Sequence, residues 1–223
     1  MNIEPNFVSD NLLFYNADNL AIMKQYPDKH FPLAIVDPPY GIKASEMTMG
    51  SGTKKKWNKN KKWDDNIPTI EYFTELQRIS KNQIIFGGNY FNLPISKGWI
   101  FWDKGIYGDS SFADGELAWT SFDVVLRVAK IRYKGFLGMD KDCRIHITQK
   151  PIALYEWILK NYANDNDKIL DTHLGSGSIA IAIDKANTLD KRNLSFVGIE
   201  IDKDYFNDSI KRFKNYKSQG LLF

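Results

Sequence analysis

The sequence predicts an α/β protein with a mostly parallel sheet that carries helices on both faces. Short apolar runs of strand type alternate with segments of helical periodicity along the chain, which favours this fold class. A glycine-rich turn joins a strand to a helix near residues 171–178, and an acidic residue follows or ends two of the apolar runs. With 223 residues the chain is long enough for one such core, so we expect a single domain over residues 1–223.

The strands are predicted from short apolar runs bounded by polar or turn residues. Seven such runs occur, at residues 12–15, 33–36, 83–86, 99–102, 124–128, 169–170 and 195–199. The turn GGNYFNLP separates the third run from the fourth, and a long polar stretch rich in glycine and lysine occupies residues 43–66. We expect this stretch to be a loop.

The helices are predicted from apolar residues that recur every three or four positions. Ile70, Phe73 and Leu76 mark a first helix, and Pro151 suits the first turn of a second one. Residues 178–186 are apolar on all sides, as expected of a helix pressed on a sheet. The other helical positions are Leu154, Trp157 and Ile158 in the second helix, and Phe206, Ile210 and Phe213 in a last, amphipathic helix.

The composition is typical of a globular protein in water, with 43% hydrophobic and 26% charged residues. No apolar run approaches the length of a membrane span, and the start of the chain lacks an apolar signal core. We therefore expect no membrane association and a cytoplasmic location. Cys143 is the only cysteine, which excludes an internal disulfide, and three scattered histidines form no zinc-ligand pattern. No metal is expected.

Positive charge is concentrated in one short stretch. The net charge is +3, yet residues 54–62 hold six lysines and no acid, so the rest of the chain is net negative. Trp57 lies within the run and Trp63 directly follows it. The pattern fits either a solvated loop or a loop that tracks phosphates, and the charge run alone leaves both open. The lysines are Lys54, Lys55, Lys56, Lys59, Lys61 and Lys62.

The segment ILDTHLGSGSIAIAI has the layout of a ligand-binding strand, loop and helix. Asp171 ends the strand, Gly175 and Gly177 let the backbone approach a ligand, and the following helix offers free N–H groups. Glu200 closes the next strand, where a carboxylate can bind a ribose diol. The loop is neither G-x-G-x-x-G nor a Walker loop, and an ordinary tight turn is the alternative interpretation.

A second site is predicted where the strand AIV runs into Asp37-Pro38-Pro39-Tyr40. The prolines hold one rigid, extended backbone, and the carbonyls of Asp37 and Pro38 have no helix or sheet partner within the motif. With the Asp37 carboxylate they form a row of acceptors, and Tyr40 adds a face for stacking. Such a group suits a planar molecule that carries an amino group. A carboxylate at the end of a buried strand costs free energy of folding, so it is expected there only if it has a function. This disfavours the alternative of a simple proline-rich turn.

These motifs, in this order, resemble the β-group of S-adenosylmethionine-dependent amino methyltransferases of DNA, of the small phage or bacterial kind. In that group DPPY precedes the glycine block, a permuted order of the usual domain. The resemblance covers nearly the whole chain, with departures at Thr172, His173 and Ile147, where the family usually carries Pro, Phe and Pro. The matching segments are FYNADNLAIMKQYP, DPPY, IIFGGNYF, GWIFWDKG, HITQKP, DTHLGSGS and VGIEIDKDYF.

The resemblance implies a Rossmann-like class I methyltransferase fold with a seven-stranded, mostly parallel sheet. It also implies methyl transfer from S-adenosylmethionine, with S-adenosylhomocysteine as product, to the exocyclic amine of adenine flipped out of double-stranded DNA. The implied catalytic residues are Asp37, Pro38, Pro39 and Tyr40. The implied cofactor residues are Asp18, Asp37, Lys150, Asp171, His173, Gly175, Ser176, Gly177, Ser178 and Glu200. The implied nucleic-acid contacts are Lys54, Lys55, Lys56, Trp57, Lys59, Lys61, Lys62, Arg132 and Lys134.

Other activities fit the same motifs. An amino-cytosine DNA methyltransferase would use the same geometry, although the family more often carries Ser in place of Asp37 for that target. An RNA adenine methyltransferase of the same permuted type would also fit, whereas the intact DPPY and glycine loop disfavour a non-catalytic nucleic-acid-binding partner. The region expected to recognise the DNA sequence, about residues 104–146, is short. Together with the family precedent for dimers, this makes a homodimer possible. The resemblance further implies restriction–modification in the cytoplasm of a bacterial or phage-infected cell.

Overall fold

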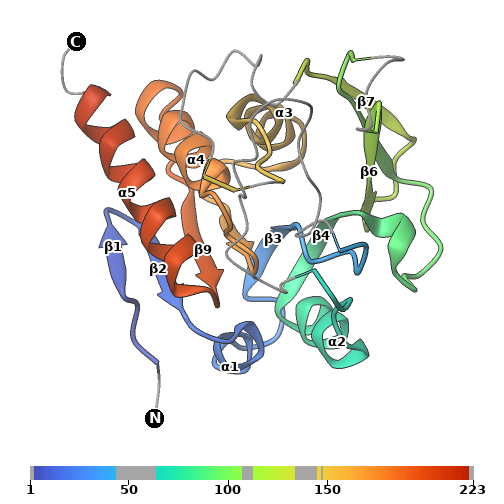
Figure 1. The fold of residues 1–223 in the computed structure, drawn as a ribbon, viewed down its shortest axis with the longest axis horizontal. Helices are drawn as coiled ribbons and strands as arrows, with labels where there is room; N and C mark the ends of the chain where they lie inside the picture. Colours follow the sequence, from blue (N-terminus) through green and yellow to red (C-terminus); the bar gives the residue numbers. More distant parts are fainter. Residues whose placement is uncertain (1–2, 44–63, 107–112, 134–144, 147, 221–223) are drawn as a thin grey trace.

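One sheet runs through the described part of the chain and contains nine strands there (Figure 1). The structure, a computed structural model, describes residues 3–43, 64–106, 113–133, 145–146 and 148–220. The strand order is β1-β2-β9-β8-β3-β4-β6-β5-β7. β1 and β6 run antiparallel to their neighbours, and the other strands share one direction. The predicted mostly parallel sheet is confirmed, and the predicted number of seven strands is wrong.

Two strands account for this difference in number. The strands are β1 (Phe7–Ser9), β2 (Leu12–Asn16), β3 (Phe31–Val36), β4 (Ser80–Phe86), β5 (Trp99–Asp103), β6 (Gly115–Thr120), β7 (Arg127–Lys130), β8 (Lys168–Asp171) and β9 (Ser195–Glu200). β1 has three residues and none of them is fully buried, so its apolar signal is weak. β6 begins with Gly and Glu, which local propensity does not assign to a strand.

The strand predicted at residues 124–128 begins three residues too early. β7 starts at Arg127, which pairs with Ile100 of β5, while Val125 and Leu126 lie outside the strand and are exposed. Pairing with the neighbouring strand sets the bounds here, because the apolar run by itself does not specify a register.

The helices are α1 (Asn19–Met23), α2 (Ile70–Ile79), α3 (Ile152–Tyr162), α4 (Ser178–Leu189) and α5 (Lys203–Gly220), and a 3₁₀ turn, η2, spans Gly88–Tyr90. The Thr69 side chain caps α2 by accepting a hydrogen bond from the Tyr72 amide. α2 buries Tyr72, Leu76 and Ile79, whereas Ile70, which was predicted to lie on the buried face, is exposed. The buried face is therefore rotated about the helix axis from the predicted one.

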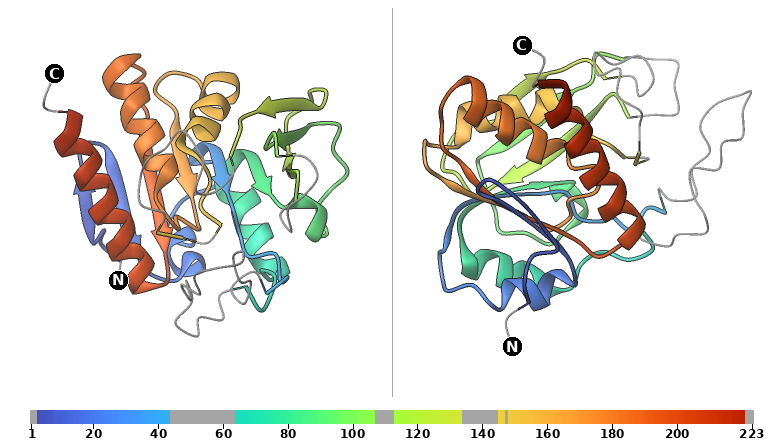
Figure 2. Two further views of the ribbon diagram at one scale, coloured as in Figure 1. Left: turned by 45° about the horizontal axis from the view of Figure 1, so that its top comes forward. Right: turned by 90° about the vertical axis from the view of Figure 1, so that its left-hand side faces the viewer.

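The helices cover the two faces of the sheet, as predicted. The side chains of α3, α4 and α5 pack with one set of strand residues, which includes Leu33 and Ile35. Helices α1 and α2 pack with the alternate set, which includes Ala34 and Val36. The right-hand view of Figure 2 shows these two layers on opposite sides of the sheet. Both faces are therefore dry, which explains why the central strands are continuously apolar.

Candidate functional site

The strand order reverses between β8 and β3, which are hydrogen-bonded neighbours in the sheet. β3 leads to β4 on one side, through α2, and β8 leads to β9 on the other side, through α4. Ligands of open α/β sheets bind outside the carboxyl ends of the strands at such a reversal. Asp171 ends β8 and Asp37 directly follows β3, so the two predicted sites meet at this point.

The glycine loop between β8 and α4 is held by the carboxylate of Glu200, at the end of β9. Glu200 Oε2 accepts a hydrogen bond from the Gly175 amide at 2.9 Å. Gly175 and Gly177 have φ angles of +52° and +71°, a region that side-chain-bearing residues rarely adopt. A Cβ on Gly175 would meet only the His173 carbonyl oxygen, in ordinary contact at 3.7 Å, so a side chain there would not clash.

The far side of the loop is tied to α5 and to the segment before α3. Arg212 Nη1 donates to the Ser176 carbonyl and to Ser178 Oγ, each at 2.9 Å. Ser178 Oγ in turn donates to the Lys150 carbonyl at 2.8 Å. Ser176 and Ser178 were predicted to contact the cofactor, and in this structure their hydroxyls contact each other at 3.1 Å.

Asp171 is 2% exposed, and its Oδ1 accepts a hydrogen bond from the His173 amide at 2.9 Å. Burial raises the pKa of this carboxyl to about 8. Burial also lowers the pKa of His173 to about 3, so its ring is neutral near pH 7. The ring meets Tyr72 edge-on and lies 3.2 Å from the Asn19 amide group. The neighbouring Asp18 caps α1 through the Ala21 amide at 2.9 Å.

The Asp37 carboxylate is engaged at both oxygens. Tyr40 donates its hydroxyl to Oδ1 at 2.7 Å, and the Lys150 ammonium lies 2.5 Å from Oδ2. Burial raises the pKa of the Asp37 carboxyl, and Lys150 opposes this shift more than any other group. Burial would lower the pKa of Lys150, but the carboxylates of Asp37 and Glu116 overcome it and the pKa lies above its usual value. The two groups lie at salt-bridge distance inside the site.

The proline motif is held in place by Asp64, a residue that the sequence analysis did not single out. Asp64 is 1% exposed, and its Oδ1 accepts hydrogen bonds from the amides of Tyr40 at 2.7 Å and Gly41 at 3.0 Å. An acid two residues after a lysine run was the available signal, but nothing local indicates that it contacts the proline motif earlier in the chain.

The Tyr40 ring already has a stacking partner. It lies parallel to Tyr90 of η2, with ring centroids 5.0 Å apart and an interplanar angle of 12°. Gly87 packs against the same ring, and a Cβ there would lie 2.2 Å from Tyr40 Cε1. Tyr90 is 45% exposed, so it forms the solvent side of this pair.

Glu116 and Lys104 extend the charged cluster, and the sequence analysis missed both. Because β6 is antiparallel, Glu116 near its start lies at the edge of the sheet where the parallel strands end. Glu116 Oε1 pairs with Lys104 at 2.7 Å, and its Oε2 lies 3.3 Å from the Lys150 ammonium. Burial would raise the pKa of Glu116, but the two ammonium groups hold it at about 2.

Several predicted residues cannot be placed. Lys54, Lys55, Lys56, Trp57, Lys59, Lys61, Lys62 and Lys134 lie outside the described residues. Arg132 is described and exposed. Within the described ranges, no helix is long and apolar enough to cross a membrane. The same part of the chain has no group of three or more His, Cys, Asp or Glu placed to hold a metal ion, and the expectation of no metal stays a prediction.

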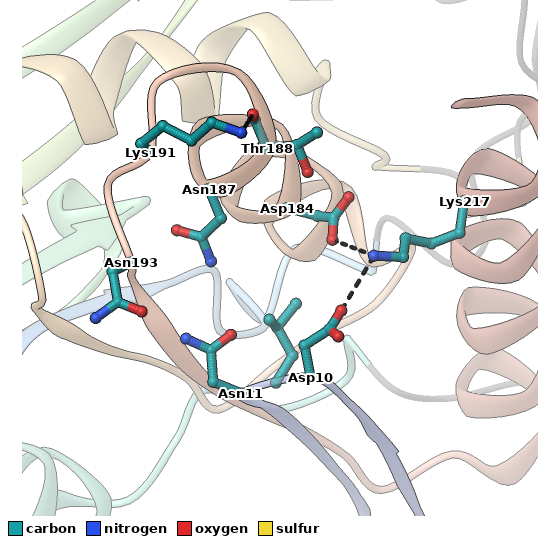
Figure 3. A pocket seen from close by; sticks show the side chains of 9 residues that line it. Asp10, Asn11, Asp184, Asn187, Thr188, Lys191, Asn193 and Lys217 are labelled. Atoms are coloured by element: carbon teal, nitrogen blue, oxygen red, sulfur yellow. Dashed lines mark hydrogen bonds and ion pairs between the residues drawn. The ribbon is translucent and has the colours of Figure 1, made fainter. Parts of the chain in front are cut away.

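An open polar depression lies between α4, α5 and the start of β2 (Figure 3). Lys217 joins two carboxylates there, Asp184 at 2.8 Å and Asp10 at 3.1 Å. The depression shares no lining residue with the Asp37 cluster, and it carries no group that the predicted chemistry needs.

Comparison with known proteins relates the chain to one family. A family model described as DNA methylase matches residues 94–211, more than half of the chain. The type II methyltransferase M1.MboII of Moraxella bovis is 39% identical over 64 residues, which are 29% of this chain and 22% of that relative. The type II methyltransferase M2.MboI of the same organism is 23% identical over 261 residues, covering 96% of this chain and 92% of the relative.

Solved structures share the fold. The M1.HpyAVI–SAM complex superposes with a TM-score of 0.56 at 23% identity, covering 90% of this chain and 99% of that chain. The PvuII DNA methyltransferase, titled cytosine-N4-specific, has a TM-score of 0.59 at 13% identity, covering 96% and 93%. These likenesses establish the class I methyltransferase fold that the sequence predicted.

Proposed function

The chain belongs to the DNA methylase family, and on this premise we propose that it transfers a methyl group from S-adenosylmethionine to the exocyclic amine of adenine in a base flipped out of duplex DNA. The supporting observation is the Asp37 carboxylate at the strand-order reversal, on a rigid proline backbone and beside the glycine loop. A stacked duplex hides the amine, so the base must leave the helix or be unpaired.

The residues around the glycine loop fit the cofactor. Gly175 is partly exposed and no side chain crowds it, so a ligand can approach the backbone there. Asp18, Asp171 and Glu200 supply acceptors for its hydroxyl and amino groups. We assign the binding of the adenosine half to these residues and to the loop. Bound there, S-adenosylmethionine supplies a methyl group on a positively charged sulfur.

The residues of the proline motif prepare the nucleophile. The lone pair of a base amine is delocalised into the ring, so the amine is a poor nucleophile until that lone pair is localised. Asp37 and the Pro38 carbonyl accept hydrogen bonds from the two N–H groups. These bonds strengthen as the nitrogen becomes tetrahedral and positive, so they favour the transition state over the ground state. Tyr40 holds Asp37 Oδ1 in position. The amine would form its bond to the methyl carbon as the carbon–sulfur bond breaks, with S-adenosylhomocysteine as the leaving group, and the positive nitrogen would then give a proton to water.

Adenine is the proposed target because the residue before the two prolines is Asp37, whereas resembling cytosine enzymes more often carry Ser there. The fold likeness to the cytosine-N4-specific PvuII enzyme keeps amino-cytosine as the second candidate. Both targets present an exocyclic amine, and the Asp37 and Pro38 acceptors suit either.

Duplex DNA is the proposed partner, with the lysines of residues 54–62 and the exposed Arg132 as phosphate contacts. A homodimer, a cytoplasmic location and a role in restriction–modification belong to the same proposal, and the type II relatives support the last of these.

The experiment that tests the activity identifies the product. The protein is incubated with S-adenosylmethionine and either duplex DNA or RNA. The nucleic acid is then digested, and its nucleosides are identified by mass spectrometry. N6-methyladenine in DNA supports the proposal, N4-methylcytosine supports the second candidate, and absence of any methylated nucleoside rejects both. Asp37→Asn should abolish transfer while cofactor affinity stays within about tenfold, as for a group acting in the transition state.

The cofactor assignment has a separate test by calorimetry. Glu200→Ala should weaken S-adenosylmethionine binding by about 1.5–3 kcal/mol, typical of hydrogen bonds to a charged group. Glu200→Gln keeps an acceptor for the Gly175 amide, so it should lose less affinity than the alanine variant. Unchanged affinity in Glu200→Ala would remove this residue from the site.

A further inference from the structure

Four side chains of alternating charge form one row of ion pairs beside the proline motif: Asp37, Lys150, Glu116 and Lys104. Lys150 lies between the two carboxylates, 2.5 Å from Asp37 Oδ2 and 3.3 Å from Glu116 Oε2. Lys104 closes the row at Glu116 Oε1, at 2.7 Å. The proposed reaction uses Asp37 and gives no role to Glu116 or Lys104.

In this arrangement Asp37 is poorly placed to receive a substrate amine. Its Oδ1 accepts from Tyr40 and its Oδ2 is taken by Lys150, so both oxygens already have protein donors. The amine nitrogen becomes positive during methyl transfer, and an ammonium at hydrogen-bond distance from the same carboxylate opposes that charge. The reaction therefore favours a state in which Lys150 has moved away from Asp37.

The surroundings of Lys150 restrict where its charge can go. The side chain is 3% exposed, and its ammonium lies 4.5 Å from the centre of the Phe86 ring and 5.8 Å from that of Tyr40. Leaving a buried ammonium without a counter-charge is costly, so Lys150 must keep a carboxylate partner as it leaves Asp37.

Glu116 supplies that partner. Its Oε2 is buried and makes no hydrogen bond to any residue that the structure describes, although Lys150 is within ion-pair distance. Lys104 holds the other oxygen and so fixes the carboxylate in place. The ammonium has three donors, and a small movement converts the 3.3 Å approach to Oε2 into a hydrogen bond while releasing Asp37 Oδ2.

We propose that Glu116 is a positioning residue that receives the Lys150 ammonium when the substrate amine binds Asp37, with Lys104 holding Glu116 in place for this exchange. The positive charge that develops on the amine then replaces the ammonium beside Asp37, and the cluster keeps its charge balance. This inference rests on the proposed function, because it assigns the exchange to the same amine-binding site.

Kinetics of Glu116→Gln test the role. The variant keeps the shape and an oxygen acceptor but loses the charge, so Lys150 should stay on Asp37. We expect kcat to fall about tenfold or more while the cofactor Kd stays within about threefold, because the ammonium that remains beside Asp37 opposes the charge that develops on the amine. Glu116→Asp, which restores the charge, should recover part of kcat. Asp184→Asn removes a carboxylate that pairs with a lysine in the separate depression, and it should leave kcat unchanged.

A spectroscopic arm separates this inference from the proposed function. The ¹⁵Nζ signal of Lys150, assigned by its loss in Lys150→Arg, is followed as S-adenosylhomocysteine and a duplex with a mismatched adenine bind. The signal should shift in the parent and not in Glu116→Gln, and thermal unfolding checks that the variant is folded. A shift in a parent that makes no methylated product would support the exchange and reject the activity. An unshifted signal in the parent, or a kcat for Glu116→Gln within about twofold of the parent, would overturn the exchange.

Discussion

Asp64 offers the sharpest test of how the proline motif is held. Its Oδ1 accepts two backbone hydrogen bonds, from Tyr40 at 2.7 Å and Gly41 at 3.0 Å, and the residue is 1% exposed. Hydrogen bonds to a charged group contribute about 1.5–3 kcal/mol each, so Asp64→Ala should cost about 3–6 kcal/mol in total. That is a large share of the roughly 5–15 kcal/mol by which folded domains are stable. Asp64→Asn keeps the acceptor without the charge and should cost about half as much.

Two measurements check this expectation. Urea denaturation gives the loss in free energy of unfolding, and amide hydrogen exchange at Tyr40 and Gly41 reports whether the motif opens locally before the domain unfolds. Asp123→Ala is the matched control, because it removes an aspartate whose ion pair with Lys97 is exposed and should contribute little. If Asp64→Ala resembles Asp123→Ala in both measurements, Asp64 does not hold the motif and the reasoning fails.

Three further predictions address Gly87, which packs against the Tyr40 ring, the buried carboxyl of Asp171, and the lysines of residues 54–62. Gly87→Ala should lower the free energy of unfolding by about 1–3 kcal/mol for the clash with Tyr40 and by a further ~1–2 kcal/mol for the positive φ. Gly105 has a similar φ but no close neighbour, so Gly105→Ala is the control and should lose only the second amount. Equal losses of stability in the two variants on thermal unfolding would contradict the contact between Gly87 and Tyr40. Burial raises the pKa of Asp171 from 3.8 to about 8, so the folded state holds a proton that the unfolded state has lost between these pH values. The parent should therefore lose ~1.4 kcal/mol of stability per pH unit, relative to Asp171→Asn, as the pH rises through this window. If the urea midpoints of the two proteins change equally from pH 4 to 8, the shift is refuted. Replacing the six lysines of residues 54–62 by Gln should remove roughly two to four phosphate contacts, each worth about 0.9 in the log–log salt slope, and an unchanged slope by fluorescence anisotropy would indicate a solvated loop.

Local sequence was sufficient where a segment's own chemistry dictates its shape. The proline pair restricts the backbone after β3 wherever it lies, and the positive φ of Gly175 and Gly177 favours glycine, which has no Cβ to strain. The face of α5 was also predictable, since Phe206, Ile210 and Phe213 are all buried as their spacing indicates.

Elements whose limits depend on a neighbour were predicted less well. β7 begins where β5 offers a partner, so the exposed run before it was mistaken for the strand. β6 has a polar start that becomes a strand only by pairing with β4 and β5. Strand pairing joins segments far apart in the chain, and local periodicity contains no record of which segments will pair.

The two motifs of this protein, the acceptor group at Asp37 and the glycine loop before α4, can be identified from the chain alone because each is a continuous segment. Their surroundings depend on how distant segments come together. Lys150 meets Asp37 across 113 residues of chain because the strand order reverses between β8 and β3. Glu116 joins them because β6 runs antiparallel and begins at the edge where the parallel strands end. Electrostatic partners are set by distance in space, and strand order and direction, which no single segment specifies, fix those distances.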